Sequence, residues 1–299
     1  MLNLLRAEWT KAVKHRLPLS FLVWIYPLGL AVLYAILTFF SVLVDKVEYG
    51  ITAFSSGLWT TDVVRTWGVL YQFPFNVLGR MLPLAYMAVM IAGEYEWDTW
   101  KNVVPRNRRA WLVLSKIVVP TALVMLSMLA TSLVVGMGQG LAHGIANRPY
   151  GPRPSGEALT AFCRDYGRQM LLGLISMLLV AAFVALSAVV ARSIVGTLLA
   201  GFFFSLSEEA WLPLIGILRT MFDQPKLINL YQYTPRYCLE NLHAWMIHGH
   251  GFAEVVAWGG PAEFTAEPSS LASLLVLVLW IASLTALAIV EFQTQDITC

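Results

Sequence analysis

Six long apolar segments constrain this chain more than any other feature of its sequence. A helix needs about 20 mostly apolar residues to cross the hydrocarbon core of a bilayer, and it satisfies its own backbone hydrogen bonds there. The sequence therefore predicts an all-α polytopic membrane protein in which residues 1–299 form a single transmembrane domain. The six predicted spans are residues 17–44, 71–92, 112–137, 170–191, 194–217 and 271–290.

Composition narrows the class of protein further. Charged residues make up only 13% of the chain, whereas soluble domains carry about 25%. The formal charge is +2 and there is no basic tract, so we expect no nucleic acid among the partners. Because the predicted spans lie in a bilayer, we expect membrane lipids among them. The sequence contains neither a GxxxxGK[ST] phosphate loop nor an HExxH zinc motif. It therefore predicts no catalytic residues, no metal and no cofactor bound by this chain.

The segments between the spans predict the orientation in the membrane. Residues 1–16 place apolar side chains at helical spacing between basic ones, which is typical of an amphipathic helix at the interface; a basic flank that only sets orientation is the alternative. Lys and Arg are denser in residues 1–16 and 93–111 than in residues 138–169 and 218–270. Because basic residues concentrate in cytoplasmic loops, we expect cytoplasmic N- and C-termini and two extracytoplasmic loops, 138–169 and 218–270.

Polar side chains in the second and fifth spans form one stripe on each helix. At 1.5 Å per residue, Arg80 and Glu208 would both lie about 20 Å from the cytoplasmic ends of their spans. Because a charge in hydrocarbon is costly, we expect Arg80 to pair with Glu208 or Glu209. The alternative is that the two acids reach the outer interface while Arg80 binds backbone carbonyls. The predicted translocation-pathway residues are Gln72, Asn76, Arg80, Ser205, Glu208 and Glu209.

Two features of the predicted outer loops leave alternatives open. Cys163 and Cys238 would both face an oxidising compartment, where they could form a disulfide or remain separate thiols. The three histidines of the segment HAWMIHGH could bind a transition metal, but no carboxylate or thiol lies among them, and solvated loop histidines are the commoner case. Pro235 predicts the start of an outer amphipathic helix.

The most specific pattern lies between the second and third spans. Acidic residues come first and basic residues follow, which suits either a solvated loop or a surface that docks to a soluble partner. The stretch resembles the corresponding loop in permease subunits of type 2 ABC exporters (the ABC-2 superfamily), which reads roughly G-E-x-E-x-G-T-x-K and then R-x6-K. Asp98 stands where that family has a glycine. The matching residues are Gly93, Glu94, Glu96, Thr99, Lys101, Arg109 and Lys116.

Both ends of the chain are also similar to that family. Glu8 and Lys11 match an opening E-x-x-K helix, and Phe292 and Asp296 match a closing F-x-x-x-D pattern. The proline-led outer helix fits as well. The resemblance implies a six-helix permease of a bacterial plasma (inner) membrane, with residues 93–111 as a cytoplasmic coupling loop.

The resemblance also implies partners and a function. It implies an exporter that pairs two permeases, identical or homologous, with separate ABC ATPase subunits that bind ATP and magnesium. The chain would then be no enzyme itself, and it would move an amphipathic or lipid-like substrate. A non-transporting membrane scaffold derived from such a permease is the alternative. The residues that the resemblance assigns to ATPase coupling are Glu94, Glu96, Thr99, Lys101, Arg109 and Lys116.

Overall fold

Six helices in the structure are long and apolar enough to cross a membrane, which confirms the all-α polytopic class. The structure is a computed structural model that describes residues 2–14, 17–43, 55–72, 75–97, 99–100, 108–252, 254–257, 260–264 and 269–295. The six helices are α2 (Leu17–Leu43), α4 (Phe75–Glu96), α6 (Arg109–Ile145), α7 (Gly156–Ala191), α8 (Ile194–Met221) and α10 (Ser270–Thr294).

Shorter elements pack against these helices or connect them. They are α1 (Leu2–Lys14), α3 (Trp59–Arg65), the 3-10 helices η3 (Thr66–Leu70) and η5 (Pro225–Tyr233), α9 (Pro235–His248), and the antiparallel strands β1 (Glu254–Ala257) and β2 (Gly260–Glu263). Helix α9 begins at the predicted proline, and the side chain of Thr234 caps it by accepting a hydrogen bond from the amide of Tyr237. The β1–β2 hairpin was not predicted.

Helices α6 and α7 are longer than the spans predicted for them. They contain 37 and 36 residues, or about 55 Å each at 1.5 Å per residue, against a hydrocarbon core of about 30 Å. Most of the predicted loop 138–169 is therefore helix. Helix α6 continues because the polar side chains of Gln139 and His143 are buried against neighbouring elements. Helix α7 begins early because Ser155 caps its first turn.

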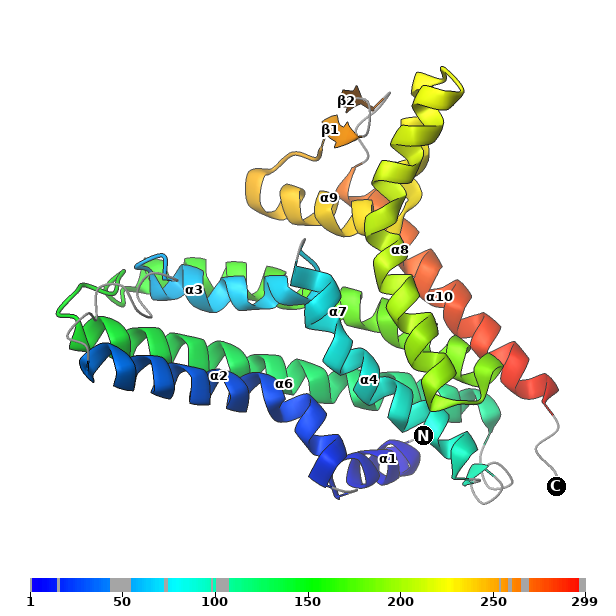
Figure 1. Ribbon diagram of the computed structural model, residues 1–299, viewed down its shortest axis with the longest axis horizontal. Coiled ribbons are helices and arrows are strands. Elements are labelled where there is room, and N and C mark those ends of the chain that lie inside the picture. Colours follow the sequence, from blue (N-terminus) through cyan, green and yellow to red (C-terminus); the bar gives the residue numbers. More distant parts are fainter. Residues whose placement is uncertain are drawn as a thin grey trace.

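The helices form two groups that diverge from one end of the molecule (Figure 1). Helix α2 packs on α6, while α8 and α10 extend in another direction, and α4 and α7 contact both groups. We call the shared end the base. It consists of α1, the C-terminal ends of α4, α7 and α10, and the N-terminal ends of α6 and α8. The opposite ends of these helices are called outer.

The largest core cluster lies where α4, α6 and α7 meet. Met87, Leu112 and Val184 are fully buried there. Alanines on α7, including Ala181 and Ala188, are also fully buried, and their small side chains allow close packing of the neighbouring helices. This core fixes α4 and α7 relative to each other.

Two glycines let η3 pack directly on the spanning helices. A Cβ at Gly79 would collide with the backbone oxygen of Val69, and a Cβ at Gly173 would lie 3.0 Å from the ring of Trp67. The close approach buries Trp67 and Leu70 completely. It also brings the carbonyl of Leu70 to the outer part of α4, where the charged side chains lie.

Candidate functional site

A buried ion pair joins α4 to α8 near their outer ends. The guanidinium of Arg80 contacts the carboxylate of Glu208, and both side chains are 1% exposed. The Arg80 Nε also donates to the carbonyl of Leu70 at 2.6 Å, and Ser176 Oγ donates to the same oxygen at 2.7 Å. The predicted pairing of Arg80 with Glu208 is therefore confirmed, and a backbone carbonyl holds the same side chain in place.

The second acid of the pair has different partners. Asn76 Nδ2 donates to Glu209 Oε1 at 2.6 Å, and Arg236 Nη1 lies 3.4 Å from that oxygen. Arg236 also forms an ion pair with Glu240, one turn along α9. Burial is the main cause that raises the pKa of Glu240, and Arg236 opposes it. We call these residues the outer cluster: Asn76, Arg80, Glu208, Glu209, Arg236 and Glu240.

Arg236 and Glu240 were missed as site residues. A signal existed, because an Arg–Glu pair at i and i+4 on a proline-led amphipathic helix predicts one polar face. What the sequence does not show is that this face turns toward α8. Gln72, by contrast, was predicted in the pathway but its Nε2 lies 2.9 Å from His243 Nε2, away from the Arg80–Glu208 pair.

The outer cluster and the neighbouring Ser205 of α8 have unused hydrogen-bonding capacity next to an apolar cavity. Four buried side-chain atoms have no hydrogen-bond partner among the described residues: Asn76 Oδ1, Arg80 Nη2, Ser205 Oγ and Glu208 Oε1. Each such atom costs about 1–3 kcal/mol. Ser205 also lines a cavity of about 300 Å³ between α4 and α8, whose other walls are apolar. Polar and apolar parts of one molecule could both be accommodated here.

At the base, Glu94 is the centre of a second buried charge cluster. Its carboxylate contacts Lys11 of α1 and the hydroxyl of Thr99. It also lies 2.6 Å from the Nζ of Lys116, which belongs to α6. Lys116 also lies 2.7 Å from Glu8 of α1. Glu94 and Lys116 are 3% and 2% exposed. Together these contacts hold α1 and α6 against the end of α4.

Two further side chains, at the end of α4 and the start of α6, bind the ends of other helices. Glu96 accepts a hydrogen bond of 2.7 Å from the amide of Ile194, at the N-terminus of α8. Arg109 donates to carbonyls at the C-terminus of α10, at 2.7–3.1 Å. An acid at a helix N-terminus and a base at a C-terminus both complement the helix dipole. The carbonyls belong to Phe292, Gln293 and Gln295.

The structure changes the interpretation of the coupling residues. Glu94 and Lys116 point into the protein, where their side chains organise the base. Lys101 lies outside the described residues. The exposed side chains beside this segment include Trp97 and Trp111, which are 43% and 38% exposed.

Of the two alternatives for Cys163 and Cys238, the structure shows separate thiols and no disulfide between them. Cys163 is an exposed free thiol on α7, and Cys238 is a buried free thiol on α9. Cys238 donates to the carbonyl of Gln232 at 3.3 Å, and burial raises its pKa to about 12. The described residues also contain no group of three His, Cys, Asp or Glu side chains that could hold a metal ion.

Comparison with known families agrees with the geometry. Residues 4–208 match a family model described as "ABC-2 family transporter protein". The match covers more than half of the chain and includes most of α1, the segment after α4 and both members of the Arg80–Glu208 pair. No curated protein matches the chain.

Proposed function

Because the chain belongs to the ABC-2 transporter family, we propose that it is the permease subunit of an ATP-driven exporter. Separate ATPase subunits, which bind ATP and magnesium, supply the energy, and a second permease completes the complex. The cargo is amphipathic or lipid-like. The protein lies in a bacterial plasma membrane with its base and both termini in the cytoplasm.

The observation that supports this proposal most directly is the set of side-chain contacts that link the helices at the base. Glu94 holds α1 and α6, Glu96 holds the N-terminus of α8, and Arg109 holds the C-terminus of α10. A displacement of the adjoining ends of α4 and α6 therefore acts on α1, α8 and α10 as well. A subunit that hydrolyses ATP beneath the base could move the α8–α10 group through these contacts.

The same two helices are joined again at their outer ends. Arg80 lies 16 residues before Glu96 on α4, and Glu208 lies 14 residues after Ile194 on α8. At 1.5 Å per residue these separations are about 24 Å and 21 Å. Helices α4 and α8 thus form a frame that is closed by Glu96 at the base and by the Arg80–Glu208 pair outside. Opening a path between them requires the outer pair to part.

The test is ATP hydrolysis by the assembled complex in lipid nanodiscs. The tagged permease should copurify with a subunit that carries the phosphate-loop sequence, and that subunit should hydrolyse ATP faster in the complex than alone. Glu96→Ala removes an acceptor from the N-terminus of α8, so it should reduce this stimulation about fivefold or more while the complex stays intact. Glu157→Ala, the same change in the first turn of α7 at the outer end, is the matched control.

Two results would count against the proposal. Full stimulation with Glu96→Ala would show that the base contacts do not couple the subunits. Failure of any phosphate-loop subunit to copurify would favour the scaffold alternative.

A further inference from the structure

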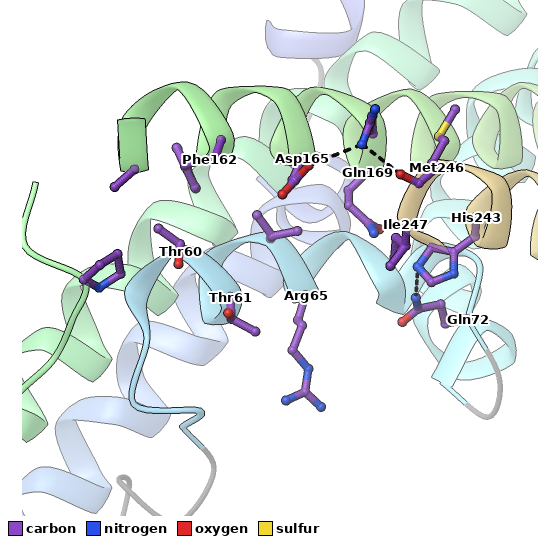
Figure 2. Close-up of a pocket in the computed structure, with 15 residues that line it drawn as sticks. Thr60, Thr61, Arg65, Gln72, Phe162, Asp165, Gln169, His243, Met246 and Ile247 are labelled. Atoms are coloured by element: carbon purple, nitrogen blue, oxygen red, sulfur yellow. Dashed lines mark hydrogen bonds and ion pairs between the residues drawn. The ribbon is translucent and has the colours of Figure 1, made fainter. Parts of the chain in front are cut away.

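A second cavity lies outside the outer cluster, between α3, α7 and α9 (Figure 2). Its volume is about 470 Å³, within the range of about 300–1,000 Å³ that is usual for small-molecule sites. Apart from Gln72, none of the predicted pathway residues lines it. The cavity therefore needs an explanation of its own.

Part of the lining of this cavity, which we call the outer cavity, is apolar, with residues from α3, α7 and α9. Val64, Phe162, Met246 and Ile247 line it. The ring of Trp59 packs on Phe162 with 4.8 Å between ring centroids, and the Trp59 indole donates to a backbone carbonyl. These contacts hold the ring of Phe162 in place, and the apolar lining suits the apolar part of a ligand.

The lining of the outer cavity also contains an unsatisfied amide. Gln169 is 7% exposed, and its Oε1 has no hydrogen-bond partner among the described residues. Figure 2 shows the side chain directed from α7 toward α3, into the cavity. Buried polar atoms in folded proteins are nearly always hydrogen-bonded. A hydroxyl or amide N–H of a ligand would supply the missing donor.

The charged side chains around the cavity leave an excess of positive charge. Arg168 is held by the carbonyl of Met246 at 2.8 Å and by Asp165 at 3.5 Å. Arg65 at the rim is exposed and makes no hydrogen bond or ion pair with the part of the chain that the structure describes. The residues that line the cavity thus include two guanidinium groups and one carboxylate. An acidic group on the ligand would complement the remaining charge.

We propose that the outer cavity binds the head of an amphipathic molecule that carries an acidic group and a hydrogen-bond donor such as a hydroxyl. The acidic group lies toward Arg65, the donor reaches Gln169, and the adjoining apolar part packs on Phe162 and Met246. Binding rests on the cavity alone; the further idea that the ligand is cargo rests on the exporter role proposed above.

The native cysteines allow a direct binding experiment. Cys163 is exposed and follows Phe162 on α7 but is not among the lining residues, whereas Cys238 is buried. The full chain with Cys299→Ser, in phosphatidylcholine nanodiscs without any ATPase, is labelled at Cys163 with an environment-sensitive fluorophore. Myristoyl lysophosphatidylglycerol, which has an acidic head with free hydroxyls, is compared with myristoyl lysophosphatidylcholine, which has a zwitterionic head.

The expected result is saturable binding of the glycerol lipid, at least about tenfold tighter than the choline lipid. Gln169→Leu and Arg65→Gln should each weaken binding about fivefold or more, while Arg153→Gln, an equal change at an exposed position outside the cavity, should not. Protection of Cys238 from alkylation shows that each variant is folded. Equal affinity for the two lipids, or unchanged affinity in folded Gln169→Leu, would overturn the proposal.

A second arm separates two sources of the ligand. If adding diacyl phosphatidylglycerol to the nanodiscs abolishes the response to the lysolipid, a membrane lipid occupies the site. If the response persists, the site takes a molecule that arrives separately; both results support the proposed chemistry. Because no ATPase is present, binding can succeed or fail independently of the exporter role.

Discussion

Replacing Arg80 by methionine tests the buried pair that joins α4 to α8. Methionine fills much of the same space but removes the charge, and it leaves Glu208, which is 1% exposed, as a buried carboxylate without its partner. Breaking such a pair from one side costs about 3–5 kcal/mol. The carbonyl of Leu70 keeps the hydrogen bond from Ser176, so its loss of Arg80 adds little. We expect the free energy of unfolding to fall by about 3–5 kcal/mol.

The double variant Arg80→Met/Glu208→Met shows whether that cost comes from the pair. Replacing both partners of a buried ion pair by apolar side chains is often close to neutral. The double variant should therefore recover most of the stability that either single variant loses. Arg6→Met, on the exposed face of α1, is the control and should change stability by less than about 0.5 kcal/mol.

The assay is reversible unfolding in mixed micelles of mild detergent and sodium dodecyl sulfate, followed by tryptophan fluorescence. The wild type, Arg80→Met, Glu208→Met and the double variant give a double-mutant cycle, which isolates the coupling energy of the two side chains. Two results would refute the reasoning: a cost below about 1 kcal/mol for Arg80→Met, or a double variant as unstable as the sum of the singles.

Three further predictions follow from other contacts. Maleimide at pH 8 should label Cys163 but not Cys238 until the protein is unfolded, because burial raises the pKa of Cys238 to about 12; non-reducing gels should show no intramolecular bridge. Gly79→Val should push η3 away from α4 and lower stability by about 1–3 kcal/mol in the same unfolding assay. Burial and the nearby His248 lower the pKa of His243 in the folded protein. The stability that neutral His243 provides is therefore complete above about pH 6.5, the pKa of an unperturbed histidine, and is lost as the pH falls through the lower pKa of the folded state. The variant His243→Gln should flatten this part of the pH–stability curve.

The sequence predicted local features such as the spans well. It predicted a contact between distant residues only where a buried charge required a partner. The spans followed from apolar length, and the pairing of Arg80 followed from the cost of a charge in hydrocarbon. Glu96 and Arg109 matched a motif, but their partners at the ends of α8 and α10 lie about 100 and 180 residues away in the chain, beyond the reach of local patterns.

The ends of α6 and α7 were missed for a different reason. Gln139 and His143 look like loop residues because they are polar, yet the fold buries both. Arg236 was overlooked because its importance depends on where α9 docks. In each case the missing information was tertiary packing, which decides whether a polar side chain ends a helix or satisfies a neighbour.

The length of α7 has a consequence for hydrophobic mismatch. Cys163 lies 28 residues from the end of α7 at Ala191, about 42 Å along the helix axis. A tilt of about 40°, the upper end of the usual range, would reduce its height to about 32 Å, still at the edge of a 30 Å hydrocarbon core. The divergence of the two helix groups in Figure 1 means that they cannot both stand along the membrane normal. If the base lies at the membrane surface, as proposed above, and α7 tilts by no more than about 40°, the cavity beside Phe162 lies at the level of the lipid head groups, where a solute can reach it without entering the acyl chains.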